Sequence, residues 1–146
     1  MSKLHNLTFN EFYEKYKAGE IQPVTDTVEI TQEMNDTFKK LTRSTVKFHD
    51  DAQLAKELGY EGNVSYSLLY EIVAVAAGEA MIGENAIDYE RNVLFRKPLF
   101  VGDVPNIKCE ISKVIRAIKT VVQKITITDA SGETKSDIVV KIKFLK

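Results

Sequence analysis

The chain has 146 residues, of which 44% are hydrophobic and 28% charged, with 20 basic and 21 acidic side chains. This size and composition fit one globular domain with a hydrophobic core. The net charge of -1 gives no electrostatic reason to expect nucleic acid or an anionic membrane as a partner. A single cysteine excludes an internal disulfide, and the first residues lack the apolar stretch of a secretory signal, so we expect a cytoplasmic protein.

The N-terminal half of the chain predicts short helices around one strand. Thr8 is a good N-cap for a helix that Gly19 ends. Apolar and polar residues alternate over residues 25–31, as in a strand. Two further helices are expected, over residues 31–43 with Thr31 as N-cap and over residues 49–60 with Asp50 or Asp51 as N-cap. We therefore predict an N-terminal helix and linker over residues 1–22 and the main domain over residues 23–146.

The most apolar segment predicts a long central helix over residues 64–81. The face expected to point into the core comprises Leu69, Ile72, Val73, Ala76 and Ala80. The opposite side carries mostly small residues, namely Ser67, Glu71, Ala74 and Gly78. A stripe of small residues lets another backbone approach closely, and a second copy of this helix across a dimer axis would fit it.

The remainder of the chain predicts four long antiparallel strands. They are expected over residues 86–98, 106–115, 119–129 and 135–145, and "ASGE" joins the last two as a hairpin. A helix that is apolar on most of its circumference must be covered, and this sheet is the only element large enough to cover it. The predicted fold class is therefore α+β, with one curved antiparallel sheet around one helix.

Three stretches resemble the MaoC-type hydratases and dehydratases of the hot-dog superfamily. The stretch "LTRSTVKFH" (residues 41–49) is similar to the hydratase signature Leu-Ser-Gly-Asp-x-Asn-Pro-Ile-His. The stretch "AKELGYEGNVSYS" (residues 55–67) aligns without a gap with the second part of that signature, a short helix followed by Gly-x-Ile-Ala-His-Gly. The stretch "FRKPLFVGD" (residues 95–103) resembles the family's Phe-x-Lys-Pro-Val-x-x-Gly-Asp. The chain is also similar to the ligand-binding domain of the fatty-acid regulator FapR. The resemblance implies a hot-dog fold and acyl thioesters of coenzyme A or acyl carrier protein as ligands.

The resemblance also implies that the hydratase site is degenerate. The family activates water with an Asp and a His five residues later. His49 keeps the second position, but Ser44 replaces the Asp, and a serine is no base near neutral pH. Val46 replaces the Asn that orients the pair, and Tyr66-Ser67 replace His-Gly. Whether the chain is an enzyme is left open, and binding of an acyl thioester is the preferred function.

The binding parts of the site are better preserved. Backbone N–H groups near Tyr66 and Ser67, at the start of the central helix, can hold a thioester carbonyl. Cations near the site can meet the phosphates of the ligand, although they are equally explained as solvated surface charges; they are Lys47, Arg96 and Lys97. The full set of ligand-binding candidates is Ser44, Gly62, Val64, Tyr66, Ser67, Arg96 and Lys97.

The two catalytic candidates are His49 and Glu71. His49 is equally explained as a helix-capping or surface histidine beside two aspartates. Glu71 is a carboxylate on the central helix, from which hot-dog thioesterases supply an Asp or Glu. In those enzymes the carboxylate follows the His-Gly position by about nine residues, where this chain has Val75. The alternatives are thus a thioesterase using Glu71 or His49, a subunit of a heteromeric hydratase, and a silent effector or scaffold.

Neither a metal nor an intrinsic cofactor is expected. Two distant histidines and one cysteine do not form a metal-ligand set. The expected ligand is a thioester of coenzyme A or phosphopantetheine, and the expected partners are acyl-CoA or acyl carrier protein. A homodimer is expected because pairing would protect an edge of the sheet.

Overall fold

The computed structural model describes residues 6–146, and its first three helices begin at the predicted caps. Helix α1 (Phe9–Lys17) follows Thr8, α2 (Gln32–Thr42) follows Thr31, and α3 (Ala52–Glu57) follows Asp51. Each cap side chain accepts a hydrogen bond from a backbone N–H in the first turn. Helix α4 (Ser67–Ile82) differs, because its N-cap Tyr66 provides no side-chain hydrogen bond.

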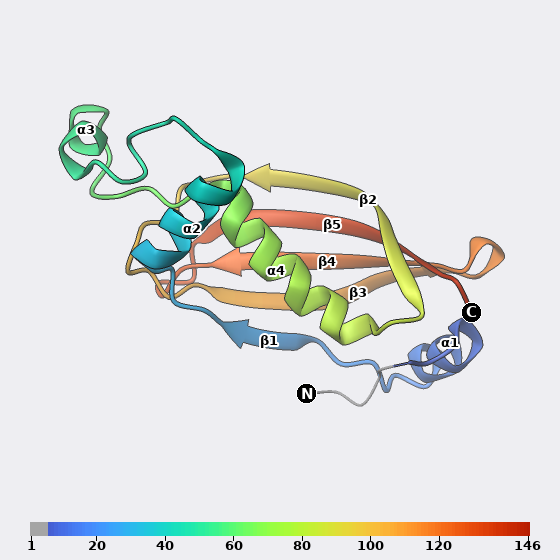
Figure 1. The fold of residues 1–146 in the computed structure, drawn as a ribbon. Coiled ribbons are helices and arrows are strands. Elements are labelled where there is room, and N and C mark those ends of the chain that lie inside the picture. Colours follow the sequence, from blue (N-terminus) through green and yellow to red (C-terminus); the bar gives the residue numbers. More distant parts are fainter. Residues whose placement is uncertain (1–5) are drawn as a thin grey trace.

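The sheet has five antiparallel strands in the order β1-β3-β4-β5-β2. They are β1 (Val24–Thr27), β2 (Ala86–Phe95), β3 (Asn106–Ile115), β4 (Thr120–Thr128) and β5 (Thr134–Phe144). The sheet curves around α4, which lies across β3 and β4, while α2 and α3 lie near the N-terminal end of α4 (Figure 1). This arrangement confirms the predicted α+β class. The exposed edges are the short β1 and the ten-residue β2.

The core lies between α4 and the concave face of the sheet. Strand β5 alternates buried and more exposed residues along most of its length, so that one face points at the helix. Its apolar contributions are Ile138, Val140, Ile142 and Phe144. Gln123 on β4 is a polar member of this buried face, and its Nε2 donates a hydrogen bond to the Gly78 carbonyl at 3.0 Å. Helix and sheet are therefore joined by both packing and a buried hydrogen bond.

Helix α4 presents to the sheet the side opposite to the one that the sequence predicted. Its buried residues are Tyr70, Glu71, Ala74, Val75, Gly78, Met81 and Ile82. Ile72, predicted to be in the core, is 54% exposed, and Ala76 is also exposed. At Gly78 the space beside the helix is occupied by the side chains of Gln123 and Ile125 on the sheet, and not by the backbone of a second helix. Because α4 is apolar on both sides, hydrophobic periodicity does not decide which side is buried.

Helix α1 packs into the same core at the end of the sheet remote from α2 and α3 (Figure 1). The ring centroids of Phe9 and Phe12 lie 5.6 and 5.3 Å from that of Phe144. The Phe9 N–H also donates to the carbonyl of Lys146 at 2.8 Å. These contacts hold α1 against the C-terminal end of β5. The domain boundary after residue 22 stays a prediction.

The single cysteine is a core residue. Cys109 is 1% exposed on β3, and burial raises the pKa of its thiol to about 11, so the thiol is unreactive at neutral pH.

Among the residues that the structure describes, no helix has the length and apolar character needed to cross a membrane.

The contact between α4 and β4 predicts the effect of Gly78→Ala. A Cβ on Gly78 would lie 2.4 Å from Gln123 Oε1 and 2.9 Å from Ile125 Cδ1. In an exposed helix this change stabilises by about 1 kcal/mol, but overpacking should instead lower the free energy of unfolding by about 1–3 kcal/mol in urea denaturation. The variant Gly78→Ala/Gln123→Ala should lose less than the two single changes together. Strict additivity would contradict this account of the contact.

Candidate functional site

His49 lies in the loop between α2 and α3 and is held in one orientation. It is 9% exposed, and its ring stacks on that of Tyr66 with centroids 3.7 Å apart. Its Nδ1 lies 2.7 Å from the carbonyl oxygen of Val64. A carbonyl only accepts hydrogen bonds, so Nδ1 carries the proton, and Nε2 of the neutral ring is an acceptor.

The free nitrogen of His49 keeps contact with solvent. Nε2 has no hydrogen-bond partner among the described residues. The polar side-chain atoms that are sealed from solvent without a partner are Asn63 Oδ1, Tyr66 Oη and Ser136 Oγ, and Nε2 is not one of them. His49 can therefore accept a hydrogen bond from, or exchange a proton with, a molecule that arrives at this loop.

Asn35 fixes the surroundings of His49. This α2 residue is 1% exposed, and its Nδ2 donates to the carbonyls of His49 at 3.2 Å and Val64 at 3.3 Å. Its Oδ1 accepts from the hydroxyl of Ser65 at 3.2 Å. One buried amide thus joins α2, the His49 loop and the segment that enters α4. Sequence analysis missed Asn35; the signal was an amide three residues before Phe38 on the apolar side of a short helix.

The N-terminal end of α4 offers unpartnered donors. The entry segment (residues 62–66) is anchored by the Ser65 N–H, which donates to the Leu99 carbonyl at 2.8 Å. The N–H groups of Ser67 and Leu68 have no partner among the described residues. The hydroxyl of Tyr66 is buried and also unpartnered. Backbone donors at a helix start favour a carbonyl oxygen or an anion.

Two other predicted residues lie near this segment without contacting His49. The Ser44 hydroxyl accepts from the N–H of Val46 at 3.4 Å, and no contact joins it to the imidazole. Gly62 is half-buried in the entry segment, and a Cβ added to it would meet nothing within 4 Å. The structure therefore brings His49, Val64 and Tyr66 together but does not join Ser44 to them.

Glu71 lies on the sheet-facing side of α4 and is already paired. It is 6% exposed, and its Oε1 accepts from Nη1 of Arg91 at 3.1 Å. Arg91 also donates to Asp88 at 2.5 Å. Desolvation lowers the pKa of Arg91, but its hydrogen bonds to Asp88 and Glu71 outweigh this and raise the pKa above the usual value. No contact joins Glu71 to His49, so the two predicted catalytic residues do not form one constellation.

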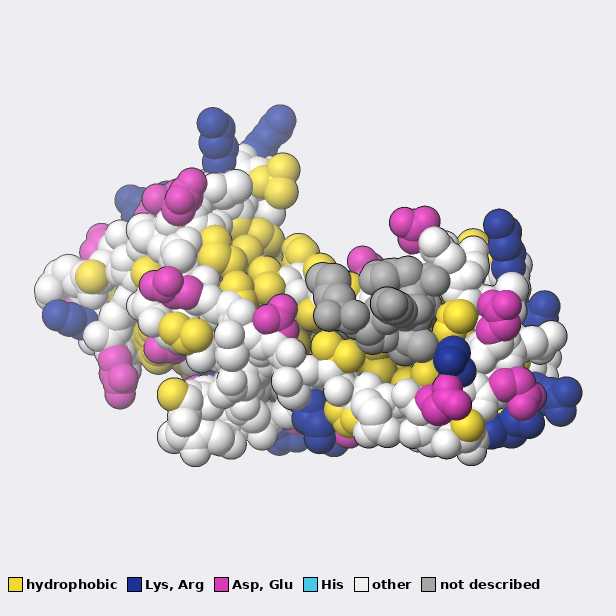
Figure 2. Space-filling model, turned by 90° about the horizontal axis from the view of Figure 1, so that it is seen from below, with side chains coloured by type: hydrophobic (Ala, Val, Ile, Leu, Met, Phe, Trp, Pro, Cys, Tyr) yellow, Lys and Arg dark blue, Asp and Glu magenta, His cyan; other side chains and the backbone are white. Residues whose placement is uncertain are grey.

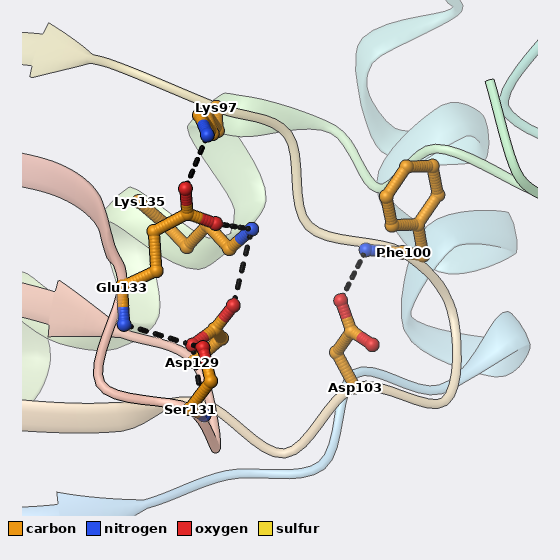
Figure 3. A network of polar contacts seen from close by, with 7 residues as sticks. All are labelled: Lys97, Phe100, Asp103, Asp129, Ser131, Glu133 and Lys135. Carbon is orange, nitrogen blue, oxygen red and sulfur yellow. Dashed lines mark hydrogen bonds and ion pairs between the residues drawn. The ribbon is translucent and has the colours of Figure 1, made fainter.

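The predicted phosphate-binding cations are also engaged. Arg96 Nε lies 2.5 Å from Asp137 Oδ2, and Lys97 pairs with Glu133 in the turn between β4 and β5. Figure 3 shows Lys135 between Glu133 and Asp129 in the same network. The hydrogen bond from the Ser131 hydroxyl is the main reason that the pKa of Asp129 is lowered, to about 2, so this carboxylate is charged at neutral pH. Arg96 and Lys97 are therefore paired with carboxylates of β5 and of the β4–β5 turn, and not with a ligand.

Two cavities border α4. One of about 420 Å³ lies between its second half and the sheet, near the β2 edge, and its wall includes Val75, Ala86 and Val140. The other, of about 360 Å³, lies between α2 and α4, and we call it the α2–α4 groove. Its lining residues are Thr31, Glu33, Met34, Thr37, Phe38, Leu41, Leu69 and Ile72. Phe38 joins this groove to the site, because its ring centroid lies 4.9 Å from that of Tyr66.

Residues 6–146 contain no cluster of three or more histidine, cysteine, aspartate or glutamate side chains placed to hold a metal ion. The chemistry of the site thus depends on hydrogen bonding, one imidazole and the backbone donors of α4.

The fold is shared with solved structures of hydratases and dehydratases. No family model matches the sequence, and no curated protein sequence matches it. R-hydratase PhaJ1 from Pseudomonas aeruginosa superposes with a TM-score of 0.80 and 18% identity, covering 95% of this chain and 86% of that one. The HadBC complex, a (3R)-hydroxyacyl-ACP dehydratase from Mycobacterium tuberculosis, gives 0.70 and 18%, covering 84% and 96%.

A third structure is that of protein SAV2348 from Staphylococcus aureus in complex with CoA. It gives a TM-score of 0.57 and 18% identity, covering 82% of this chain and 78% of that one. Likeness at this level of identity concerns the fold, which the sequence resemblance predicted. The chain is thus a hot-dog fold protein with the architecture of the MaoC-like hydratases and dehydratases.

Proposed function

We propose that this chain binds an acyl thioester, of coenzyme A or of a phosphopantetheine arm, without hydrating it. The observation that carries the proposal is the fixed imidazole of His49 beside the unpartnered donors of the α4 N-terminus. A thioester carbonyl is an acceptor that the Ser67 and Leu68 N–H groups can satisfy. The structures of PhaJ1 and of the CoA complex support this ligand class by their shared fold.

The same geometry argues against hydration. Adding water to an enoyl thioester needs one group that removes a proton from water and one that delivers a proton to carbon. His49 is a single such group, and Ser44, at the family's carboxylate position, bonds to the Val46 N–H. The thioesterase alternative gains no support, because Arg91 neutralises the Glu71 carboxylate.

Ser67→Pro tests the binding site while leaving α4 intact. Proline is tolerated at the first position of a helix, and Tyr66 before it is already extended with a ψ of 126°, so the melting temperature should be unchanged. Loss of the Ser67 N–H should weaken binding of octanoyl-CoA about 2–10-fold, corresponding to about 0.5–1.5 kcal/mol for one hydrogen bond, in isothermal titration calorimetry. Ser67→Ala, which keeps this N–H, is the control and should change neither quantity. Failure of the unaltered protein to bind acyl-CoA of any chain length would refute the proposed function.

The absence of a catalytic carboxylate predicts the outcome of an activity assay. Crotonyl-CoA, followed by loss of its enoyl absorbance, should be hydrated no faster than in buffer. Hydration that disappears in His49→Ala would show that one imidazole suffices and would overturn the proposal of a non-converting site.

Binding is further proposed to take place in a homodimer. Strand β2 is a ten-residue edge whose exposed side chains include Ile87, Tyr89 and Leu94. A long apolar edge strand tends to pair with another strand. A second copy added at β2 would also close the 420 Å³ cavity, which lies beside this edge. Because the HadBC structure is a complex, assembly with a different chain is the alternative to a homodimer.

The mass of the protein in solution checks this assembly. Sedimentation equilibrium should give twice the 16.5 kDa of one chain. Ile87→Lys/Leu94→Lys should shift the protein to monomer, because charges on an edge strand oppose pairing. Val104→Lys/Ile118→Lys places the same two charges on exposed apolar residues outside β2 and should leave the dimer intact. A monomeric unaltered protein would instead favour a heteromeric partner or a solitary chain.

A further inference from the structure

The cavity near the β2 edge has an acidic wall that the proposed thioester site does not use. It has a volume of about 420 Å³ and lies between the second half of α4 and the sheet, and we call it the β2 cavity. Val140 and Ile142 contribute to its apolar wall, and its charged lining residues are Glu79, Glu84 and Asp88. No lysine or arginine of residues 6–146 lines it. The charges around this cavity therefore favour a cationic ligand over an anionic one.

A buried amide oxygen faces the β2 cavity without a partner. Gln123 lines the cavity and is 1% exposed. Its Nε2 donates to the Gly78 carbonyl at 3.0 Å and lies 3.6 Å from Met81 Sδ, so these contacts set the orientation of the amide. Its Oε1 accepts no hydrogen bond from residues 6–146, yet it is not among the unpartnered atoms that are sealed from solvent. The oxygen is therefore reached from the cavity and can accept a hydrogen bond from a ligand there.

The C-terminal end of α4 adds negative potential at the same place. The last turn of this helix contains no basic residue, and Gly83, which follows it, lines the cavity. The carbonyls of Ala80, Met81 and Ile82 accept no backbone hydrogen bond from residues 6–146. Unpaired carbonyls at the end of a helix carry the negative end of its dipole and favour a cation.

Two of the three carboxylates at the β2 cavity have no cation of the chain beside them. Asp88 pairs with Arg91 on the same strand. Glu79 and Glu84 are exposed and have no ion-pair partner within residues 6–146. These two carboxylates are therefore available to a ligand.

Glu79 lies close to the free amide oxygen. The Gln123 side chain packs against Gly78, where an added Cβ would lie 2.4 Å from Oε1. Glu79 is the next residue of the helix, and consecutive Cα atoms are only about 3.8 Å apart. One ligand group can therefore contact both Oε1 of Gln123 and the carboxylate of Glu79.

We infer that the β2 cavity binds a primary aliphatic ammonium ion. The ammonium donates N–H groups to Gln123 Oε1 and to the Glu79 carboxylate, and the hydrocarbon chain lies on Val140 and Ile142. A cation leaves water at acceptable cost only when it is paired and hydrogen-bonded, and this arrangement supplies both. The inference does not rest on the proposed function, because the thioester site lies at the opposite end of the 16-residue α4.

The second cavity of the chain offers an internal comparison. Figure 2 shows apolar side chains gathered in a hollow over α2 and α4, and Glu33 is the one charged residue among the described residues that line the α2–α4 groove. A hydrocarbon chain alone would suit that groove as well as the β2 cavity. An ammonium group distinguishes the two, because it needs the amide oxygen and the carboxylates.

The test compares ligands that share a hexyl chain, titrated into the full chain at neutral pH and followed by NMR. Hexylammonium should bind at least fivefold more tightly than 1-hexanol, and hexanoate should not bind over the same concentration range. Hexyltrimethylammonium keeps the charge but has no N–H group, so it should bind at least fivefold more weakly than hexylammonium. The methyl signals of Val140 and Ile142 should shift. Shifts confined to Leu69 and Ile72 would place the ligand in the α2–α4 groove and overturn the inference.

Substitutions separate the charge from the shape of the cavity. Glu79→Gln should weaken hexylammonium binding at least fivefold and leave 1-hexanol binding unchanged, whereas Glu33→Gln, at an exposed carboxylate of α2, should change neither. Ala80→Leu fills the β2 cavity and should weaken both ligands at least fivefold with an unchanged melting temperature. Ala76→Leu makes the same change at an exposed position of α4 outside the cavity and is the control.

Three results would contradict the ammonium site. They are absence of hexylammonium binding to the unaltered protein, equal affinity for hexylammonium and hexanoate, and equal effects of Glu79→Gln and Glu33→Gln. Displacement of hexylammonium by octanoyl-CoA would assign the cavity to the acyl chain and would also overturn the inference. Each of these outcomes leaves binding of a thioester at the α4 N-terminus to be judged by its own experiment with Ser67→Pro.

Discussion

The hydrogen bonds of Asn35 are the constraint on which the site depends. This amide ties α2 to the carbonyls of His49 and Val64, and its oxygen accepts from Ser65. Without it, the loop that carries His49 and the segment that enters α4 would be joined mainly by the Nδ1 contact of the imidazole itself. A buried amide with its bonds satisfied rigidifies its surroundings, whereas a half-satisfied one is costly. The position of α2 relative to the His49 loop therefore depends on the same few bonds that hold the surroundings of the imidazole.

Helix α4 imposes the second constraint, because it is apolar on every side. The sheet covers the side that carries Ala74 and Gly78, where side chains of β4 pack against the helix. Helix α2 covers only part of the other side, and Leu68 and Ile72 remain 54% exposed. An apolar helix face left in water favours association. The α2–α4 groove and the β2 edge are thus two distinct apolar surfaces of the chain.

Local patterns predicted the elements well, and long-range contacts decided what the patterns left open. Thr8, Thr31 and Asp51 cap their helices because a cap bonds to N–H groups a few residues away, a relation visible in sequence. The buried side of α4 was not predictable in this way, since neither side is polar. The engagement of Arg96 and Lys97 depends on β5 and on the β4–β5 turn, which lie some forty residues further along the chain. Asn35 was missed for the same reason, because its partners are 14 to 30 residues away.

The distribution of charge underlies the proposal that this chain binds a thioester without converting it. Glu71, a buried carboxylate on α4, is held by Arg91, and the cations at the β2 end are held by acidic residues of β5 and its turn. At the site, the described groups without a partner are the Nε2 of His49 and the N–H groups of Ser67 and Leu68. Donors of this kind orient a ligand that has a carbonyl group. This arrangement is the reason for proposing that the site holds a thioester without converting it.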